Sequence, residues 1–225
     1  MKIGIIGAGS VGQTLATKLI ANSHDVALGI RNPSPAELAK ERQMAEPLNM
    51  WQKKTGGKVV TFAEAAKHGE IIVNATGGGI SIEALKAAGE ANLGTKILID
   101  VANPLDFSLG MPPSILPQYA HGTSLAEEIQ KAFPKVRVVK ALNTVSHTIM
   151  TAPEKLKGDH DLFISGNDAD AKSTVTSLLK KEFGWKSIVD MGDIKGARGT
   201  EQFLVMWVTL WGVVGTPDFN IKIVK

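Results

Sequence analysis

The sequence contains no cysteine. Disulfide bonds, thiolate catalysis and cysteine-ligated zinc are therefore excluded. The five histidines are scattered among the acidic residues, and neither H-E-x-x-H nor a comparable ligand spacing occurs. We predict no metal site. The absence of cysteine also fits a reducing compartment, and we expect a cytoplasmic protein.

Long runs of one residue type are also missing. The most apolar stretch, Phe203 to Val214, is shorter than the roughly 20 residues that span a bilayer. The amino terminus lacks the extended apolar core of a signal peptide. The 25 basic and 22 acidic residues alternate, giving a net charge of +3 without a basic run that follows a phosphate backbone. We expect a soluble protein with neither membrane nor nucleic acid as a partner, and the small positive excess suits an anionic small molecule.

Short β-branched runs alternate with longer amphipathic stretches along the 225 residues, which predicts βαβ units and a parallel sheet. The predicted fold class is α/β, a Rossmann-type doubly wound, mainly parallel sheet with a small helical C-terminal extension. We assign residues 1–192 to this Rossmann domain and residues 193–225 to a C-terminal helical segment. The predicted strands are Lys2–Ile6, Val26–Ile30, Lys58–Val60, Ile71–Asn74, Ile97–Asp100, Val136–Lys140, Leu162–Ser165 and Ser187–Asp190.

Local signals predict where several helices start and stop. Thr61 with Glu64, and Ser124 with Glu127, have the spacing of a capping box. A helix is expected to begin at Pro35 and to end or bend at Pro47. We also expect a cap at Asn167 or Asp168, a long loop over Phe107–His121, and a short edge strand at Ile221–Ile223.

The segment Gly7-Ala8-Gly9-Ser10-Val11-Gly12 matches G-x-G-x-x-G. It follows a predicted strand and opens an amphipathic helix, which is the context that makes this pattern informative. Gly7 permits the tight turn, Gly9 leaves room for a pyrophosphate, and Gly12 allows close packing of helix on strand. Free N–H groups at the helix start, including those of Ser10 and Val11, favour phosphate. The alternative is a turn that only allows close packing.

The end of the second strand predicts which dinucleotide binds. NAD-binding proteins carry an acid there that holds the ribose hydroxyls. Asp25 lies at the wrong end of that strand, and the correct end reads Ile30-Arg31-Asn32-Pro33-Ser34. Arg31 can pair with a 2′-phosphate, and Asn32 and Ser34 can donate further hydrogen bonds. We predict NADP; the alternative is a solvated Arg31 and a site that accepts both cofactors.

Three other predicted strand ends carry short polar residues at the edge where ligands bind in such sheets. They are Asn74 to Gly79, with Thr76 and Gly77; Asp100 to Pro104, with Asn103; and Lys140 to Thr144, with Asn143. We take Thr76, Gly77, Asn103 and Pro104 as cofactor contacts, and Thr76, Asn143 and His147 as candidate catalytic residues. His121 and His147 are the histidines best placed to donate a proton. The alternative for each is a turn, capping or structural role.

The segments Lys2–Gly12 and Gly29–Asn32 together resemble the NADP oxidoreductases that depend on the deazaflavin coenzyme F-420. The run Val138–Val145 resembles a segment near that family's substrate face. Ile164–Ala171, and Asp190–Gly192 followed by Ala197-Arg198, resemble its C-terminal landmarks. The family in turn resembles the oxidoreductase domain of the six-transmembrane ferric reductases.

This resemblance implies a nicotinamide over the carboxyl ends of the strands with a flat acceptor stacked on it. By this resemblance, Arg31 corresponds to a basic residue that binds the 2′-phosphate. Family members often have a small hydroxyl residue before that arginine, where this sequence has Ile30, and a proline after the fourth strand, where it has Asn74-Ala75-Thr76-Gly77. The second departure lies near the acceptor.

The segment Glu201 to Val214 predicts a helix that is apolar nearly all round, with Trp207 and Trp211 on one face. It is expected to serve either as a core helix or as a homodimer contact, and it can also wall the acceptor pocket.

Three functions remain open at this point. The first is hydride transfer between NADPH and a planar acceptor such as deazaflavin F-420 or a flavin. The second is reduction of a small carbonyl or imine compound, although relatives of that kind append a larger helical domain. The third is a regulatory protein that binds NADP without turnover.

Overall fold

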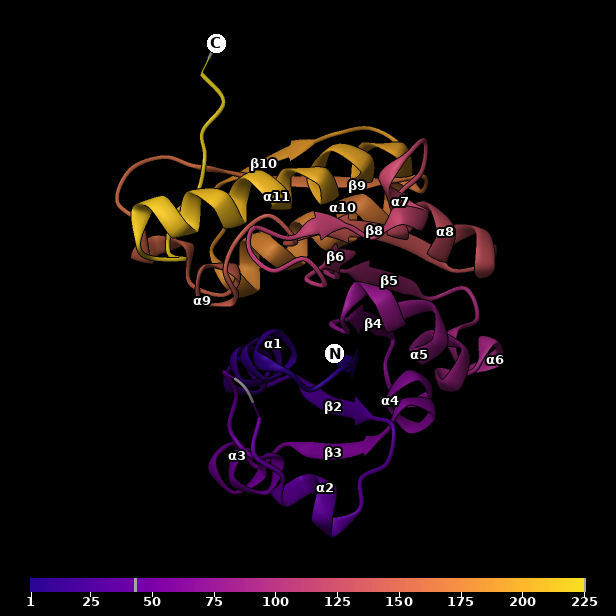
Figure 1. Cartoon of the computed structure of the whole chain (residues 1–225). Coiled ribbons are helices and arrows are strands. Elements are labelled where there is room, and N and C mark those ends of the chain that lie inside the picture. The colour runs from indigo at the N-terminus through magenta and orange to yellow at the C-terminus, as the bar shows by residue number, and fades with distance from the viewer. Residues whose placement is uncertain (43, 225) are drawn as a thin grey trace.

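The computed structural model describes residues 1–42 and 44–224, which form an eight-stranded sheet flanked by helices (Figure 1). The strand order is β10-β9-β8-β5-β4-β1-β2-β3. All neighbouring strands are parallel except β8 and β9, which are antiparallel. The fold is therefore the predicted Rossmann-type, mainly parallel sheet. The strands are β1 (Lys2–Ile6), β2 (Asp25–Ile30), β3 (Lys58–Thr61), β4 (Ile71–Asn74), β5 (Ile97–Asp100), β8 (Arg137–Ala141), β9 (Asp161–Gly166) and β10 (Ser187–Asp190).

Strand order reverses beside β1, because the chain adds β2 and β3 on one side and β4, β5 and β8 on the other. In doubly wound sheets a ligand binds outside the carboxyl ends of the strands at this switch point. All eight strands predicted for the sheet between Lys2 and Asp190 are present, and each boundary lies within one residue of the prediction.

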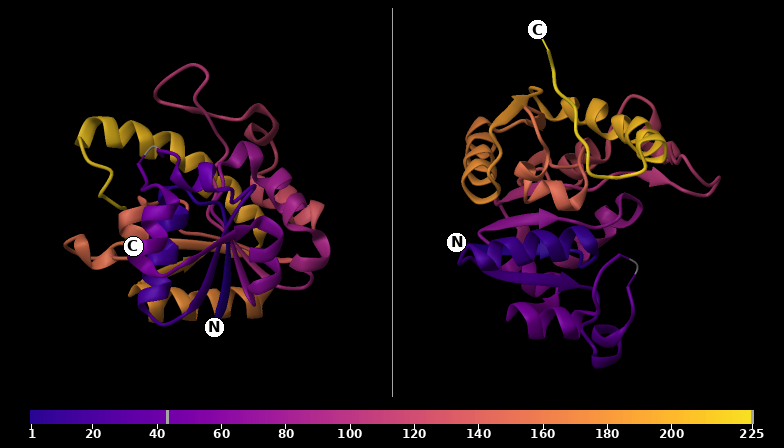
Figure 2. Two further views of the ribbon diagram at one scale, coloured as in Figure 1. Left: turned by 90° about the horizontal axis from the view of Figure 1, so that it is seen from below. Right: turned by 90° about the vertical axis from the view of Figure 1, so that its left-hand side faces the viewer.

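Helices cover both faces of the sheet (Figure 2). The side chains between helices and sheet form two apolar layers. One contains side chains from α1 (Ser10–Ala21), α3 (Leu48–Thr55), α9 (His147–Met150) and α10 (Ala169–Leu178). The other contains side chains from α4 (Phe62–His68), α5 (Ser81–Ala88), α6 (Glu90–Leu93), α7 (Pro117–Ala120) and α8 (Leu125–Ala132). The remaining short elements are α2 (Pro35–Ala39), the paired strands β6 (Leu105–Asp106) and β7 (Ser114–Ile115), the 3₁₀ turns η1 (Gly78–Ile80), η2 (Pro153–Lys155) and η4 (Ile194–Gly196), and the π turn η3 (Leu179–Phe183).

The C-terminal helix α11 (Ala197–Val214) begins inside the sheet domain and ends outside it. Ala197 belongs to one of the two sheet cores, whereas Trp207 lies in a separate small cluster and stacks on Phe219 with ring centroids 5.3 Å apart. Val213 is 80% exposed. Of the two expected roles, that of a core helix is therefore wrong for the last turns of α11. Among the described residues, no helix is both long and apolar enough to span a membrane.

Several local expectations are confirmed by hydrogen bonds. Thr61 and Glu64 form a reciprocal capping box at the start of α4. Asp168 accepts a hydrogen bond from the Ala171 N–H. Ser124 accepts one from the Glu127 N–H, but the Glu127 carboxylate accepts from the Ser124 hydroxyl rather than from its N–H, so only half of that predicted box forms. These bonds satisfy donors that a helix start otherwise leaves without partners.

Three other expectations are wrong. The helix that begins at Pro35 ends at Ala39, and Pro47 instead precedes a second helix, α3, where its fixed φ suits a helix start. The predicted loop over Phe107–His121 contains β7 and α7. Ile221–Ile223 forms no strand; the Ile221 carbonyl accepts from the Asp161 N–H, which docks this segment on the start of β9 in the same chain.

Candidate functional site

The turn between β1 and α1 brings bare backbone to the switch point. Gly7 has φ +106°, and a Cβ there would lie 2.6 Å from the Ala75 carbonyl oxygen. A Cβ on Gly12 would lie 2.0 Å from the Gly7 carbonyl oxygen. Both glycines are therefore required by packing. A Cβ on Gly9 would meet no atom within 4 Å, so this residue faces open space at the start of α1.

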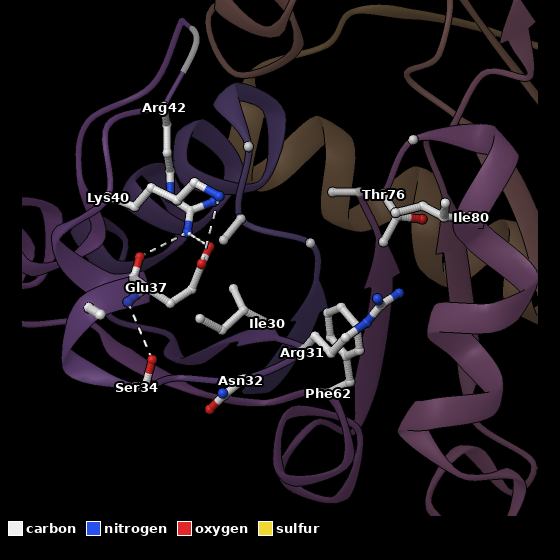
Figure 3. A pocket seen from close by; sticks show the side chains of 16 residues that line it. Ile30, Arg31, Asn32, Ser34, Glu37, Lys40, Arg42, Phe62, Thr76 and Ile80 are labelled. Carbon is white, nitrogen blue, oxygen red and sulfur yellow. Dashed lines mark hydrogen bonds and ion pairs between the residues drawn. The ribbon is translucent and has the colours of Figure 1, made fainter.

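A cleft of about 830 Å³ opens beside this turn (Figure 3). One wall comes from the β2–α2 connection and the following segment, and the opposite wall comes from the residues after β4. Seven predicted cofactor contacts line it: Gly7, Gly9, Arg31, Asn32, Ser34, Thr76 and Gly77. The other lining residues are Ala8, Ile30, Ala36, Glu37, Lys40, Arg42, Phe62, Ala75 and Ile80.

Arg31 projects into this cleft from the carboxyl end of β2. The side chain is exposed, and within residues 1–42 and 44–224 it makes no ion pair. Figure 3 shows its guanidinium pointing toward the Thr76 and Ile80 side. Asp25 lies at the other end of β2, as predicted, where it pairs with Lys58 at 2.9 Å. Arg31 is thus free to bind an anion at the switch point.

Glu37 is the acidic residue on the same wall. Its carboxylate pairs with Arg42 at 2.8 Å, and Lys40 lies 4.0 Å away. Ser34 accepts a hydrogen bond from the Glu37 N–H at 3.3 Å, which leaves the Ser34 hydroxyl hydrogen available. Because Arg42 neutralises Glu37, the wall keeps a net positive charge. Glu37, Lys40 and Arg42 were not among the predicted site residues, although their charges after the second strand were a usable signal.

Thr76 stands on the opposite wall, two residues after β4. Its hydroxyl donates to Asn74 Oδ1 at 2.7 Å and lies 2.8 Å from the Ser81 hydroxyl. Gly77 is exposed beside it. Both residues therefore face the part of the cleft on the β4 side of the glycine turn.

Asn103, Pro104 and Asn143 lie behind this wall and do not line the cleft. Gly78 N–H donates to the Asn103 carbonyl at 3.2 Å, so the Asn103–Pro104 backbone supports the turn after β4. Asn143 is 2% exposed, and its amide donates to Asn103 Oδ1 and to the Thr200 carbonyl, both at 3.0 Å. Ser10, Val11 and Gly12 form the first turn of α1 and also lie outside the lining.

His147 begins α9, and its ring is partly buried. Burial lowers the pKa of His147, and the nearby Asp218 carboxylate opposes that effect. His121 follows α7 and is exposed. Neither histidine lines the cleft. In the described part of the chain, no group of three or more histidine, aspartate or glutamate side chains is arranged to hold a metal ion.

Comparisons with known proteins agree with this geometry. The family model described as "NADP oxidoreductase coenzyme F420-dependent" matches residues 2–104. A candidate F420-dependent NADP reductase from Arthrobacter sp. FB24, solved at 1.70 Å, is 46% identical, with a TM-score of 0.93 over 100% of both chains.

Two more distant relatives differ in length. Metalloreductase STEAP3 of Rattus norvegicus is 28% identical over 217 residues, which are 94% of this chain and 38% of that protein. The chain thus spans well under half of that relative. An imine reductase from Myxococcus stipitatus, solved in complex with NADP⁺, is 17% identical, with a TM-score of 0.62 over 95% of this chain and 64% of that one. This last likeness shows the fold alone.

Proposed function

Because the chain belongs to the family of coenzyme F420-dependent NADP oxidoreductases, we propose that it binds NADP in the cleft and transfers hydride between the nicotinamide and a planar acceptor. A deazaflavin such as F420, or a flavin, is the proposed acceptor class. The observation that carries the proposal is Arg31, a guanidinium without an ion-pair partner among the described residues, in one cleft with the glycine turn.

The two halves of the cleft suit the two halves of the dinucleotide. The pyrophosphate fits the open space at Gly9, where the N–H groups and positive dipole end of the 12-residue helix α1 favour an anion. The adenosine 2′-phosphate then lies on the β2 side, within reach of Arg31, Asn32 and Ser34. The nicotinamide riboside lies on the β4 side, beside Thr76 and Gly77.

The wall around the 2′-phosphate favours NADP over NAD. An acid that holds the ribose hydroxyls would repel a 2′-phosphate, and here the lining carboxylate of Glu37 is paired with Arg42. Arg31 can form charge-assisted, bidentate hydrogen bonds to phosphate. The residues present therefore fit NADP.

Bound NADPH supplies a hydride, so this chain need only hold two rings at near-attack distance and exclude water. We propose that Thr76 and Gly77 orient the nicotinamide riboside. The Asn103–Asn143 pair holds the loops after β5 and β8 in place beneath the proposed nicotinamide site. The role of His147 as a proton donor remains a prediction, since this residue lies outside the cleft lining.

The proposal is tested with purified protein in two steps. NADPH and NADH are first titrated by nucleotide fluorescence, and we expect tighter binding of NADPH. NADPH oxidation is then followed with F420, FMN, a ferric chelate, and small carbonyl and imine compounds. Turnover with the flat acceptors supports the proposal, turnover only with a carbonyl or imine supports that class instead, and tight binding without turnover supports a regulatory role.

Oligomeric state is a separate proposal. The exposed apolar residues Met206, Val213 and Val214 on α11 favour the predicted homodimer contact. Light scattering should give twice the monomer mass of 23.9 kDa. A monomeric mass that persists at high protein concentration would rule the contact out.

A further inference from the structure

Three charged side chains from distant segments meet in the interior, beneath the wall that carries Thr76. Lys140 lies in β8, Asp100 ends β5 and Glu201 lies in α11. The side chains of Lys140 and Asp100 are 0% exposed, and that of Glu201 is 2% exposed. The Lys140 Nζ lies 2.9 Å from an oxygen of each carboxylate, and it also donates to the Ala102 carbonyl. All N–H bonds of the ammonium group are therefore used.

Both carboxylates are surrounded by donors. Glu201 accepts from the N–H groups of Leu125 and Ala126 at the start of α8, at 2.8 and 3.1 Å. Burial raises the pKa of Glu201, and Lys140 opposes that effect. Burial also disfavours the charge on Lys140, but Asp100 and Glu201 outweigh it and raise the lysine pKa. The Lys140 ammonium donates to Asp100 Oδ2 at 2.9 Å, so its charge holds Asp100 as an acceptor.

This charge fixes the orientation of the next side chain. Asn74 is fully buried, and its Nδ2 lies 2.8 Å from Asp100 Oδ1. A carboxylate can only accept, so Asn74 must direct its NH₂ group to Asp100 and its carbonyl oxygen to Thr76. Asn74 Oδ1 lies 2.7 Å from the Thr76 hydroxyl. Because a hydroxyl has one hydrogen, Thr76 gives it to Asn74 and has none for the cleft. Toward the Ser81 hydroxyl, 2.8 Å away, Thr76 can then only accept, which leaves its second lone pair for a ligand.

We propose that the buried pair Lys140–Asp100, acting through Asn74, fixes Thr76 as a hydrogen-bond acceptor toward the cleft, so that this position selects a hydrogen-bond donor on the nicotinamide riboside. Asp100, Lys140 and Asn74 are positioning residues in this scheme. The donor on the ligand is either the carboxamide NH₂ or a ribose hydroxyl. An isolated threonine would rotate to suit a donor or an acceptor, whereas this one cannot. The inference rests on the proposed NADP site.

The first test removes the acceptor without changing the side-chain shape. Thr76→Val should weaken NADP⁺ binding by about 2- to 10-fold, as expected for one hydrogen bond. Binding of 2′,5′-ADP, which lacks the nicotinamide riboside, should not change, and Thr76→Ser should restore wild-type affinity for NADP⁺. Ser81→Ala is the matched control, because it removes the other neighbouring hydroxyl and should leave NADP⁺ affinity intact. The inference is overturned if Thr76→Val binds NADP⁺ as tightly as wild type, or if Ser81→Ala loses as much NADP⁺ affinity as Thr76→Val.

The second test follows the effect from the buried cluster. In Asp100→Asn, the new amide oxygen should face Lys140, its NH₂ should face Asn74, and Asn74 should turn so that Thr76 receives a hydrogen. We expect a loss of NADP⁺ affinity similar to that in Thr76→Val, and no further loss in the double variant. Additive losses would show that Asp100 acts independently of Thr76 and would overturn the relay. If Asp100→Asn does not fold, the Thr76 and Ser81 variants still decide the inference.

Two further measurements separate the possible sources of each result. The 3-acetylpyridine analogue of NADP⁺ lacks the carboxamide NH₂; weaker binding by wild-type protein, with no added loss in Thr76→Val, identifies that group as the donor. Equal binding of the analogue and NADP⁺ identifies a ribose hydroxyl, and both results support an acceptor at Thr76. A wild-type protein that binds neither NADP⁺ nor 2′,5′-ADP would refute the proposed function itself.

Discussion

Asn103 and Asn143 hydrogen-bond to each other in both directions across the carboxyl edge of the sheet. Asn143 Nδ2 donates to Asn103 Oδ1 at 3.0 Å, and Asn103 Nδ2 donates to the Asn143 carbonyl at 2.9 Å. A further bond from Asn143 to the Thr200 carbonyl ties this pair to α11. The pair therefore connects the loops after β5 and β8 with the C-terminal helix.

Asn143→Ala should destabilise the protein by about 1–3 kcal/mol, because it removes two hydrogen bonds of a buried side chain and leaves the partly buried Asn103 Oδ1 without its donor. A loss of each kcal/mol corresponds to a Tm decrease of about 2–4 °C in a protein of this size. Calorimetry of the variant measures this change. Gln202→Ala, at an exposed position on α11, is the control and should melt like wild type. An unchanged Tm for Asn143→Ala would contradict the supporting role.

Gly9→Ala should weaken cofactor binding while leaving the fold intact. The added Cβ meets no protein atom, so we expect a stability change below about 1 kcal/mol. The same Cβ points into the space proposed for the pyrophosphate, and the affinity for NADPH should fall at least about 10-fold. Fluorescence titration and a thermal melt of the same sample test both parts.

Gly12→Ala is the opposite case and serves as the comparison. Its Cβ would lie 2.0 Å from the Gly7 carbonyl oxygen, so backbone must move and stability should fall by about 1–3 kcal/mol or more. If the Gly9→Ala protein is stable and binds NADPH like wild type, the pyrophosphate does not bind at this turn.

Asp161 should make the docking of the C-terminal segment sensitive to acid. Burial disfavours its charge, but hydrogen bonds from Ser187, the Ile223 N–H and Lys222 outweigh burial and lower the pKa from 3.8 to about 2. A carboxyl whose pKa is lowered on folding stabilises the protein above its unfolded pKa, and that stabilisation is lost as the pH falls toward the folded value. The shift corresponds to about 2 kcal/mol at neutral pH.

The measurement is the difference in Tm between wild type and Asp161→Asn as a function of pH. The difference should be full above about pH 5 and should shrink between about pH 4 and pH 2. Asp170→Asn, at an exposed position on α10, should follow the wild-type curve throughout. A wild-type advantage over Asp161→Asn that persists unchanged below pH 2 would contradict this account.

The sheet was predictable from sequence because buried parallel strands read as short apolar runs. Ile71-Ile72-Val73 is such a run, and β4 has the predicted boundaries. The phosphate turn was predictable for a similar local reason, since three glycines follow one strand directly. Where the local signal was ambiguous the prediction failed: Pro47 marks a helix start as readily as a helix end.

The part of the site that depends on distant residues was not predictable. Lys140 and Asp100 were noted only as strand ends, and Glu201 only as part of an apolar helix. Their contact depends on the pairing of β5 with β8 and on how α11 returns over the sheet edge. Pairing of this kind leaves no periodic signal in a single sequence. The same limit explains why Asn143 was predicted at the site although it does not line the cleft. Its position at a strand end does not reveal that its amide turns toward Thr200.

Selectivity between NADPH and NADH tests the central claim most directly. We expect Arg31→Ala to raise the Kd for NADPH by about 10- to 100-fold, because the variant loses a charge-assisted hydrogen bond to phosphate. The Kd for NADH should change by less than about 3-fold. Arg137→Ala, at the amino end of β8, is the matched control and should leave both values unchanged. Equal losses of NADPH and NADH affinity in Arg31→Ala would contradict recognition of the 2′-phosphate by this residue.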